Sequence, residues 1–136
     1  MRLNQASDFA LRILMLLAER KEPMTVDAVT SELHLVKSHV MKIVAKLTRQ
    51  GILNSTRGRT GGISLARPTE DISVGEVVRS IEADFAIVEC MRDGESQCVF
   101  SSHCKLRGVI SDATRAFLQV LDQQSLRNIT VSLPTQ

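Results

Sequence analysis

Three cysteines are the residues best suited to chemistry in this sequence, and all of them lie between positions 90 and 104. Cys90, Cys98 and Cys104 are separated by runs of seven and five residues. An odd number of cysteines so close together argues against a disulfide framework and favours metal binding or redox chemistry. Thiolates are preferred ligands of iron–sulfur clusters and of zinc. Three thiolates would leave one coordination position for a different ligand.

The fourth ligand and the kind of metal site are open on the cysteine spacing. His103, Glu89 and, from the other end of the chain, Asp8 are candidates for the fourth position. A Cys3His zinc site is one alternative to a cluster. For Asp8 the alternative role is an ion pair with Arg12, four residues later on the same helical pattern. Inert buried cysteines fit this polar segment poorly, and a cysteine nucleophile with His103 as its base lacks any sign of a pocket or oxyanion hole.

A run of unopposed positive charge is the second feature suited to binding. Residues 1–70 hold 11 Lys and Arg against 6 Asp and Glu, whereas residues 71–136 hold 6 against 9. Residues 33–69 hold seven Lys and Arg and not one acidic residue. Because a solvated surface helix normally mixes both signs, this pattern indicates a surface for a polyanion such as DNA.

Hydrophobic periodicity predicts the elements that position these residues. Residues 5–20 have apolar side chains at i, i+4, i+7 and i+8, which predicts a helix. Thr25 can cap a second helix, and a third is predicted over about 37–50 after a short break. Gly51 follows at a position where helices often adopt a left-handed backbone. Two helices joined by so short a turn, the second strongly basic, indicate a helix-turn-helix.

The third helix would present one face to the core and the opposite face to DNA. Its predicted core face is Val40, Ile43, Val44 and Leu47. Its predicted DNA face is Lys37, Ser38, His39, Lys42, Lys46 and Arg49. Residues at its N-terminal end would lie deepest in a major groove, and those near its C-terminal end would lie closer to phosphates. A Gly-rich hairpin over residues 52–67 is predicted to form a wing, whose Arg57 and Arg59 could enter the minor groove.

The second half of the chain is predicted to hold two further helices around a loop. Residues 73–76 have the spacing of a capping box and would open the first of them. Residues 84–103 show no sustained period, which indicates a loop. The last long element, over about 103–124, has apolar residues at intervals of 4, 3, 4 and 3, typical of a helix packed along another helix. That seam is Leu106, Ile110, Ala113, Phe117 and Val120.

Together these patterns predict a mainly α fold, a winged helix-turn-helix with a small β-hairpin wing and a long C-terminal dimerisation helix. We expect a DNA-binding domain over residues 1–83, a cluster-binding loop over 84–104, and a dimerisation helix with a C-terminal tail over 105–136.

Several motifs together resemble the iron–sulfur winged-helix regulators, the family that includes IscR and RirA. They are MRL at 1–3, SDFALR at 7–12, HVMK at 39–42, RGRTGGISLARP at 57–68, DFAIVEC at 84–90, Cys98, and CKLRGV at 104–109. The resemblance covers roughly residues 1–130, and the cysteine segment looks most like that of the repressors that sense nitric oxide. Two departures are His34, where the turn commonly has Gly, and Val36, where a Ser usually caps the recognition helix.

The resemblance implies a homodimer that pairs through the long C-terminal helix and binds a palindromic operator in double-stranded DNA. It implies a [4Fe–4S] cluster held by Cys90, Cys98, Cys104 and an Asp near the N-terminus, a position that Asp8 matches. In such repressors nitric oxide attacks the cluster and repression is released. Because iron-responsive members have similar cysteine spacing, a regulator of iron or cluster status is the alternative.

Other functional classes fit the sequence less well. No run of 18 apolar residues is present, so no membrane span is predicted. No cleavage site follows the apolar-rich residues 9–18, and we therefore expect a cytoplasmic protein. Because nothing in the sequence suggests a catalytic pocket or oxyanion hole, we expect that it is not an enzyme. An electron-transfer iron–sulfur protein would leave the basic helix and wing unexplained. A zinc-stabilised DNA-binding module without sensing would explain them, and metal analysis separates it from a cluster protein.

Overall fold

A computed structural model describes residues 2–59, 61–94 and 97–133. Its α-helices are α1 (Gln5–Arg20), α2 (Val26–Leu33), α3 (Lys37–Arg49), α4 (Val74–Ile81), α5 (Lys105–Asp122) and α6 (Leu126–Ile129). Its strands are β1 (Leu53–Thr56) and β2 (Gly62–Leu65), and its 3-10 turns are η1 (Thr69–Asp71), η2 (Glu89–Met91) and η3 (Ser101–His103). The predicted mainly helical fold with a single hairpin is confirmed.

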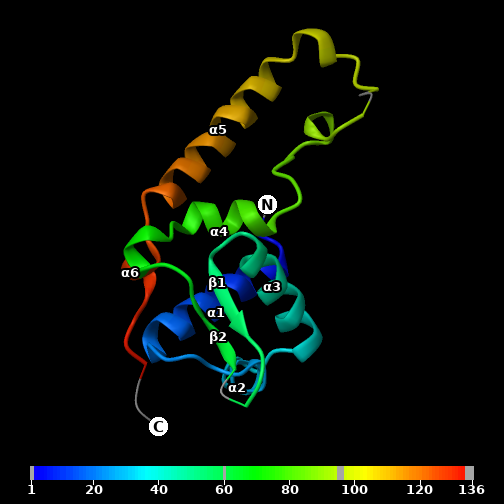
Figure 1. The fold of residues 1–136 in the computed structure, drawn as a ribbon. Coiled ribbons are helices and arrows are strands. Elements are labelled where there is room, and N and C mark those ends of the chain that lie inside the picture. Colours follow the sequence, from blue (N-terminus) through cyan, green and yellow to red (C-terminus); the bar gives the residue numbers. More distant parts are fainter. Residues whose placement is uncertain (1, 60, 95–96, 134–136) are drawn as a thin grey trace.

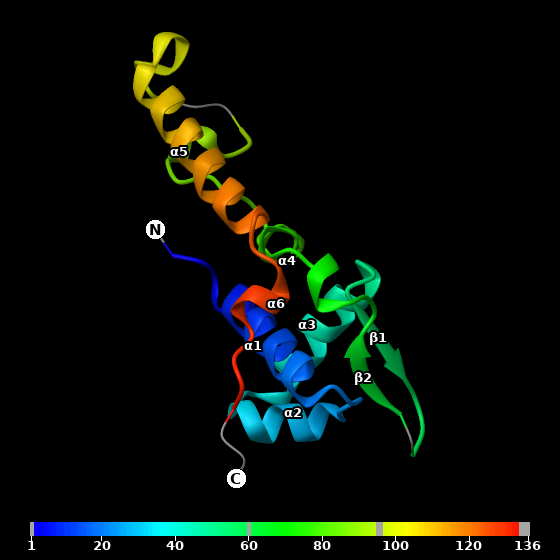
Figure 2. The same cartoon turned by 90° about the vertical axis from the view of Figure 1, so that its left-hand side faces the viewer.

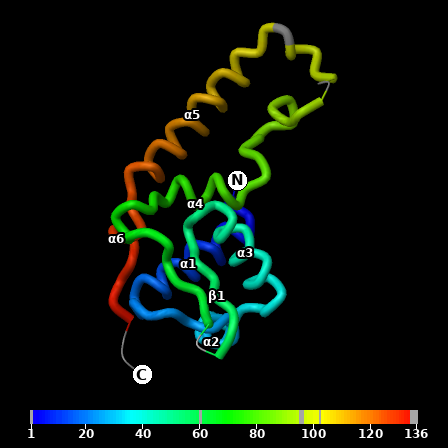
Figure 3. Tube along the Cα trace, viewed as in Figure 1, coloured from blue at the N-terminus to red at the C-terminus, as the bar shows by residue number. Residues whose placement is uncertain are grey.

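The chain folds into a body and an arm that projects from it (Figure 1). The body contains α1 to α4, the β1–β2 hairpin and α6. The arm consists of residues 84–122, that is, the cysteine-bearing loop and α5. The trace in Figure 3 leaves the end of α4, runs outward along the loop and returns down α5 to the body. The cysteines therefore lie on a different part of the molecule from the helix-turn-helix.

Side chains at the helix starts explain where several helices begin. The Thr25 hydroxyl accepts a hydrogen bond from the Ala28 N–H (3.1 Å), and the Ser73 hydroxyl accepts one from the Glu76 N–H (3.0 Å), as the sequence predicts. His34 ends α2 with φ +52°, the left-handed conformation that Gly adopts more readily. Val36 precedes α3 and provides no side-chain cap. The helix-turn-helix turn is thus built without the Gly and Ser that are common there.

The core lies between α1, α3, α4 and the hairpin. Val40, Ile43, Val44 and Leu47 of α3 are all buried, which confirms the predicted core face. Gly51 follows α3 with φ +71°, also as predicted. The remaining buried aliphatic side chains come mainly from α1, α4 and the hairpin. This packing orients the opposite face of α3 towards solvent.

The wing is attached to the body at its base. β1 and β2 are antiparallel, with Leu53 opposite Leu65. Ile63 exchanges backbone hydrogen bonds with Met24, at 3.0 and 2.7 Å, in the segment just before α2. A Cβ at Gly62 would lie 2.8 Å from the Met24 carbonyl oxygen, so the close approach of these backbones needs a glycine. The tip of the hairpin extends beyond this attachment (Figure 2).

The segment after α5 differs from the predicted tail. Residues 126–129 form α6, which packs against α1 and η1. The Leu126 N–H donates to the Ile72 carbonyl and the Val74 N–H donates to the Gln124 carbonyl, both at 2.8 Å. The Leu126 side chain is 1% exposed within the core of the body. Residues 126–129 therefore pack into the core of the body and are not an appendage of α5.

Truncation of Leu126 tests that conclusion. Because the side chain is fully buried among aliphatic neighbours, Leu126→Ala is expected to lower the free energy of unfolding by about 2–5 kcal/mol. Val131→Ala is the matched control, since Val131 is 62% exposed and should leave stability unchanged. Urea denaturation followed by circular dichroism measures both. Equal stability of the two variants would show that the C-terminal segment is not packed in the core.

Candidate nucleic-acid interface and cysteine site

The exposed face of α3 carries small and basic residues in alternation. Ser38, Lys42, Ala45 and Arg49 recur every three or four residues and are all exposed. They lie opposite the buried face of the same helix. Small side chains at Ser38 and Ala45 allow the helix backbone to approach a groove closely, while Lys42 and Arg49 supply positive charge. This arrangement fits a helix that enters the major groove of DNA.

Three other residues of the predicted DNA face have partners within the protein. The Lys46 ammonium donates to the Ile81 carbonyl (2.9 Å), so Lys46 faces the end of α4. Lys37 forms an ion pair with Asp27 (2.6 Å). The ring of His39 lies 6.5 Å from that of Phe9 in α1, in a stacked arrangement. Lys46 in particular is half-buried and serves to connect α3 to α4.

The wing carries the two predicted arginines at its tip. Arg57 and Arg59 flank Gly58, whose φ of +108° is available to glycine and strained for other residues. Both arginines are exposed. No salt bridge found among the described residues involves either of them. They are therefore available to a polyanion beside α3.

The cysteines lie along the arm. Cys90 belongs to η2, Cys104 immediately precedes α5, and Cys98 lies in the loop between them. All three are thiols. Cys90 and Cys98 line one cavity of about 760 Å³, together with Glu89, Arg92, Asp93, Gly94 and Gln97. The Cys104 sulfur accepts a weak hydrogen bond from the Arg107 N–H (3.4 Å) at the N-terminus of α5.

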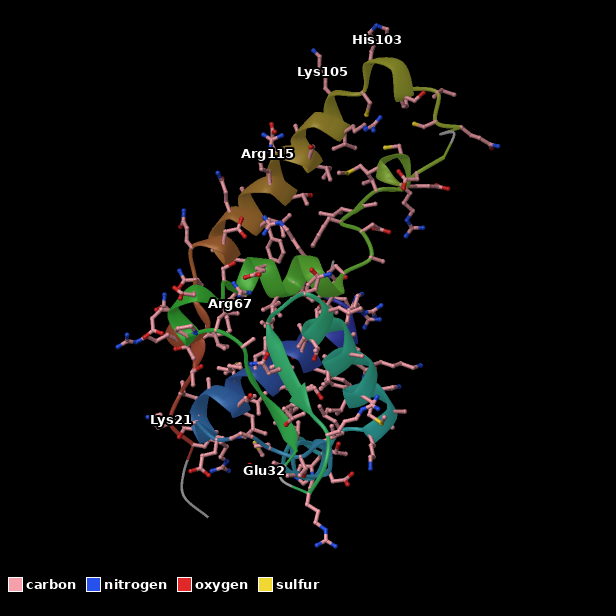
Figure 4. The ribbon with its side chains drawn as sticks, viewed as in Figure 1. Lys21, Glu32, Arg67, His103, Lys105 and Arg115 are labelled. Atoms are coloured by element: carbon pink, nitrogen blue, oxygen red, sulfur yellow. The ribbon has the colours of Figure 1, made fainter. Side chains whose placement is uncertain are left out.

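The predicted ligands are only partly brought together. Cys104 and Asp8 do not line the cavity that Cys90 and Cys98 share. Asp8 instead forms an ion pair with Arg12 (2.8 Å), which is the alternative role that the sequence allows for it. Over residues 2–59, 61–94 and 97–133, no three Cys, His, Asp or Glu side chains converge closely enough to hold one metal ion. Figure 4 shows His103 at the far end of the arm, beside the start of α5.

The donors nevertheless fit an iron–sulfur cluster by their chemistry. Three thiols on one short segment are the ligand type that such clusters require. Two of them already line a common cavity. Glu89, Asp93 and Arg92 make the surroundings of these cysteines polar. Polar surroundings suit a charged cofactor better than a buried apolar site would.

The end of α4 forms a connection that the sequence did not indicate. The Glu82 carboxylate accepts hydrogen bonds from the Asn4 N–H (2.9 Å), the Asn4 side-chain amide (2.9 Å) and the Ser7 hydroxyl (2.6 Å). Ser7 is fully buried and directly precedes Asp8. The preceding residue, Ile81, accepts the Lys46 hydrogen bond from α3. The start of α1, the end of α4 and the recognition helix thus meet where the arm begins.

A second connection fixes the other end of the arm. Arg79 of α4 pairs through two hydrogen bonds with Asp122, the last residue of α5. These hydrogen bonds from the guanidinium lower the pKa of the Asp122 carboxyl. The carboxylate occupies the space that a side chain at Gly75 would need. Gly75 therefore permits the contact that attaches α5 to α4.

Helix α5 exposes an apolar stripe that differs in part from the predicted seam. Leu106, Ala113 and Val120 are exposed, as expected for a surface against which another helix can pack. Ile110 and Phe117 are half-buried, and Phe117 faces an apolar cavity shared with Phe85 and Ile87 of the arm's own loop. The exposed stripe, at intervals of 3, 4, 3 and 4, is Leu106, Val109, Ala113, Ala116 and Val120.

None of the helices, within the part of the chain that the structure describes, is long and apolar enough to cross a bilayer.

Comparisons with known proteins place this geometry in context. Residues 3–132 match the family model Rrf2, described as an iron-dependent transcriptional regulator. The HTH-type transcriptional regulator NsrR of Bacillus subtilis (strain 168) is 39% identical over 131 residues, which are 95% of this chain and 90% of that protein. The HTH-type transcriptional repressor NsrR of Streptomyces coelicolor is 33% identical over 138 aligned residues, which cover 99% of this chain and 91% of that protein. Among solved structures, CymR (YrzC), the global cysteine regulator of B. subtilis, aligns with a TM-score of 0.75 at 22% identity, covering 96% of each chain.

Proposed function

The chain belongs to the Rrf2 family of transcriptional regulators, and from this membership we propose that it is a repressor whose binding to operator DNA is controlled by an iron–sulfur cluster and nitric oxide. It is a regulator and not an enzyme. The observation that carries the DNA-binding role is the exposed face of α3, basic and free of acidic residues, beside a wing with two exposed arginines. A protein of this kind acts in the cytoplasm, where thiols stay reduced.

The residues divide by the kind of DNA contact that each can make. Ser38 and Lys42, towards the N-terminal half of α3, would face base edges or the neighbouring phosphates, and Arg49 would face a phosphate. Arg57 and Arg59 would reach a groove from the wing. Lys37 and His39 stand at the start of the same helix. Lys46 belongs to this set by its position, yet its hydrogen bond to the Ile81 carbonyl directs it towards the end of α4.

Two substitutions separate these contacts. If Lys42 contacts a phosphate, Lys42→Ala should weaken binding to all sequences alike and reduce the slope of log K against log salt by about 1. Arg59→Ala should weaken operator binding by about 1–3 kcal/mol if Arg59 reads a groove. Fluorescence anisotropy over a range of salt concentrations measures both effects.

The control for this pair is Arg115→Ala, which removes the same charge from the arm (Figure 4). Arg115 lies on α5 and pairs locally with Asp112, three residues earlier, so its loss should leave DNA affinity unchanged. If wild-type protein and the Lys42 and Arg59 variants bind operator DNA equally, α3 and the wing do not form the DNA interface.

Cys90, Cys98 and Cys104 are the residues that would hold the cluster, with Asp8 as the fourth ligand. A bound cluster would supply iron with which nitric oxide reacts. Because a carboxylate is a harder and weaker ligand than a thiolate, the Asp8 position would be the more readily opened one. Ligation by Asp8 would require release of its ion pair with Arg12. The cluster type is proposed as [4Fe–4S], as in the nitric-oxide-sensing relatives that the sequence resembles.

The chain's own residues offer a route from that site to the DNA interface. Glu82 holds the first turn of α1, including Ser7 next to Asp8, against the end of α4. Ile81 holds Lys46 of α3 at the same place. A change in the position of α1 or of the arm would therefore be transmitted to the recognition helix. Such a connection can serve as a switch when two arrangements of these helices have similar free energies.

An iron-responsive regulator is the second candidate, because the matching family model is described as iron-dependent. It uses the same residues and differs in the signal that releases DNA. Chelation of iron should then lower operator affinity, while nitric oxide should have little effect. Absorption spectra and metal analysis of anaerobically purified protein separate both candidates from a zinc-stabilised module.

A further inference from the structure

The recognition helix exposes one large apolar side chain within its polar face. Met41 is 54% exposed, whereas Met15, Met24 and Met91 are buried or half-buried. Exposing a methionine to water leaves its apolar surface without a favourable contact. A large apolar side chain on a helix face whose other exposed residues are small, polar or basic therefore suggests a partner with an apolar feature at that point.

The neighbours of Met41 leave it accessible to such a partner. Lys37 and Ser38 precede it by one helical turn, and Ala45 follows it by one turn, so all three share its side of α3. Ser38 and Ala45 are small and exposed. Lys37 is bound to Asp27, which lies on α2. The side chain of Met41 is thus larger than those of Ser38 and Ala45, and it extends further from the helix on the surface proposed to enter the groove.

We infer that Met41 is a specificity-determining residue that contacts the 5-methyl group of a thymine in each half of the operator. This inference rests on the proposed DNA-binding function. The thymine methyl is the apolar group that base pairs present in the major groove. The cations around Met41 attract phosphates and carry no sequence information by themselves. The flexible, polarisable thioether of methionine can adapt to such a methyl group.

Replacing thymine by deoxyuridine tests this contact, because the replacement removes the methyl group and keeps every base-pair hydrogen bond. The full-length, cluster-loaded protein first selects a binding sequence from random duplex DNA. Each thymine of that sequence is then replaced singly, and affinity is measured. At one thymine in each half-site, the loss should be about fourfold, the effect of one buried methyl-sized group. Replacement in both half-sites should give about fifteenfold.

Variants assign the effect to this side chain. Met41→Ala and the polar Met41→Gln should bind the thymine and deoxyuridine sites equally, whereas the apolar Met41→Leu should retain most of the discrimination. Val131→Ala, which removes a similarly exposed apolar side chain from the C-terminal segment, should discriminate like the wild type. Circular dichroism verifies that each variant is folded.

The possible results separate this inference from the function on which it rests. A wild-type protein that binds its selected DNA but is insensitive to deoxyuridine, or a Met41→Ala variant that keeps the wild-type pattern, overturns the role of Met41 alone. Failure of the cluster-loaded protein to bind any duplex DNA overturns the proposed function and the role of Met41 with it.

Discussion

Replacement of Cys90, Cys98 or Cys104 by Ala is expected to abolish cluster assembly and to reduce operator affinity to the level of non-specific binding, a loss of about a thousandfold or more. Each thiolate would be one of only three strong ligands, and a cluster does not assemble stably on two. The three residues lie on the arm, away from α3 and the wing, so none of the substitutions removes a DNA contact (Figure 1). Iron and sulfide analysis together with operator titration measures both effects.

Two further variants make this result specific. Asp8→Ala should retain a cluster more often than a cysteine variant but make it more labile, because a weaker ligand has been removed. His103→Ala should keep the cluster and the operator affinity, since Asp8 and not His103 is the proposed fourth ligand, whereas a Cys3His zinc site would lose its metal. A cysteine variant that binds operator DNA as tightly as the wild type would contradict control of DNA binding by the cluster.

Val109→Asp is expected to convert the protein into monomers with poor affinity for the palindromic operator. Val109 is 63% exposed and lies in the apolar stripe of α5, which is free in a single chain. If two copies pair through this stripe, each would have to bury an unpaired carboxylate, at about 3–5 kcal/mol for each. Dimer affinity should therefore fall by at least about a hundredfold. Analytical ultracentrifugation at micromolar concentrations measures the change.

The matched control introduces the same charge outside the apolar stripe. Gln119 is exposed on the polar face of α5, and Gln119→Asp should leave the dimer intact. Ile110→Asp should lower the dimer affinity less than Val109→Asp does, because Ile110 is half-buried within its own chain. A sedimentation coefficient unchanged by Val109→Asp would place the dimer interface elsewhere on the molecule.

Elements whose signals are local could be predicted closely from the sequence. The caps Thr25 and Ser73, the buried face of α3 and the left-handed Gly51 all depend on residues within a few positions of one another. The wing could be predicted for the same reason, because glycines mark its tip. Local side-chain chemistry is sufficient to define such features.

Features that depend on distant residues could not be predicted. Helix α6 is only four residues long, too short for a periodic pattern, and it forms because Leu126 fills the core and bonds to Ile72. Glu82 carries no motif, and its importance comes from Asn4 and Ser7, more than 70 positions earlier. The positive charge of Lys46 is evident in the sequence and predicts a DNA contact. Its hydrogen-bond acceptor, the Ile81 carbonyl, is brought to it only by the fold.

The candidate cysteine site shows the same division. The number and spacing of the cysteines indicate metal or redox chemistry without any structure. Which side chains converge is a property of the folded chain, and among the described residues Cys90 and Cys98 share a cavity that Cys104 and Asp8 do not line. The ion pair of Asp8 with Arg12 was one of two roles that the sequence allowed, and ligation by Asp8 is proposed on family resemblance.

An anaerobic titration of the cluster-loaded protein with nitric oxide, with cluster absorption and operator affinity followed in the same samples, tests the proposed sensing most directly. We expect the absorption of the cluster and the affinity for operator DNA to fall together, until affinity reaches that of the cysteine variants. Loss of the cluster absorption at constant operator affinity would contradict it and would leave the metal a structural role.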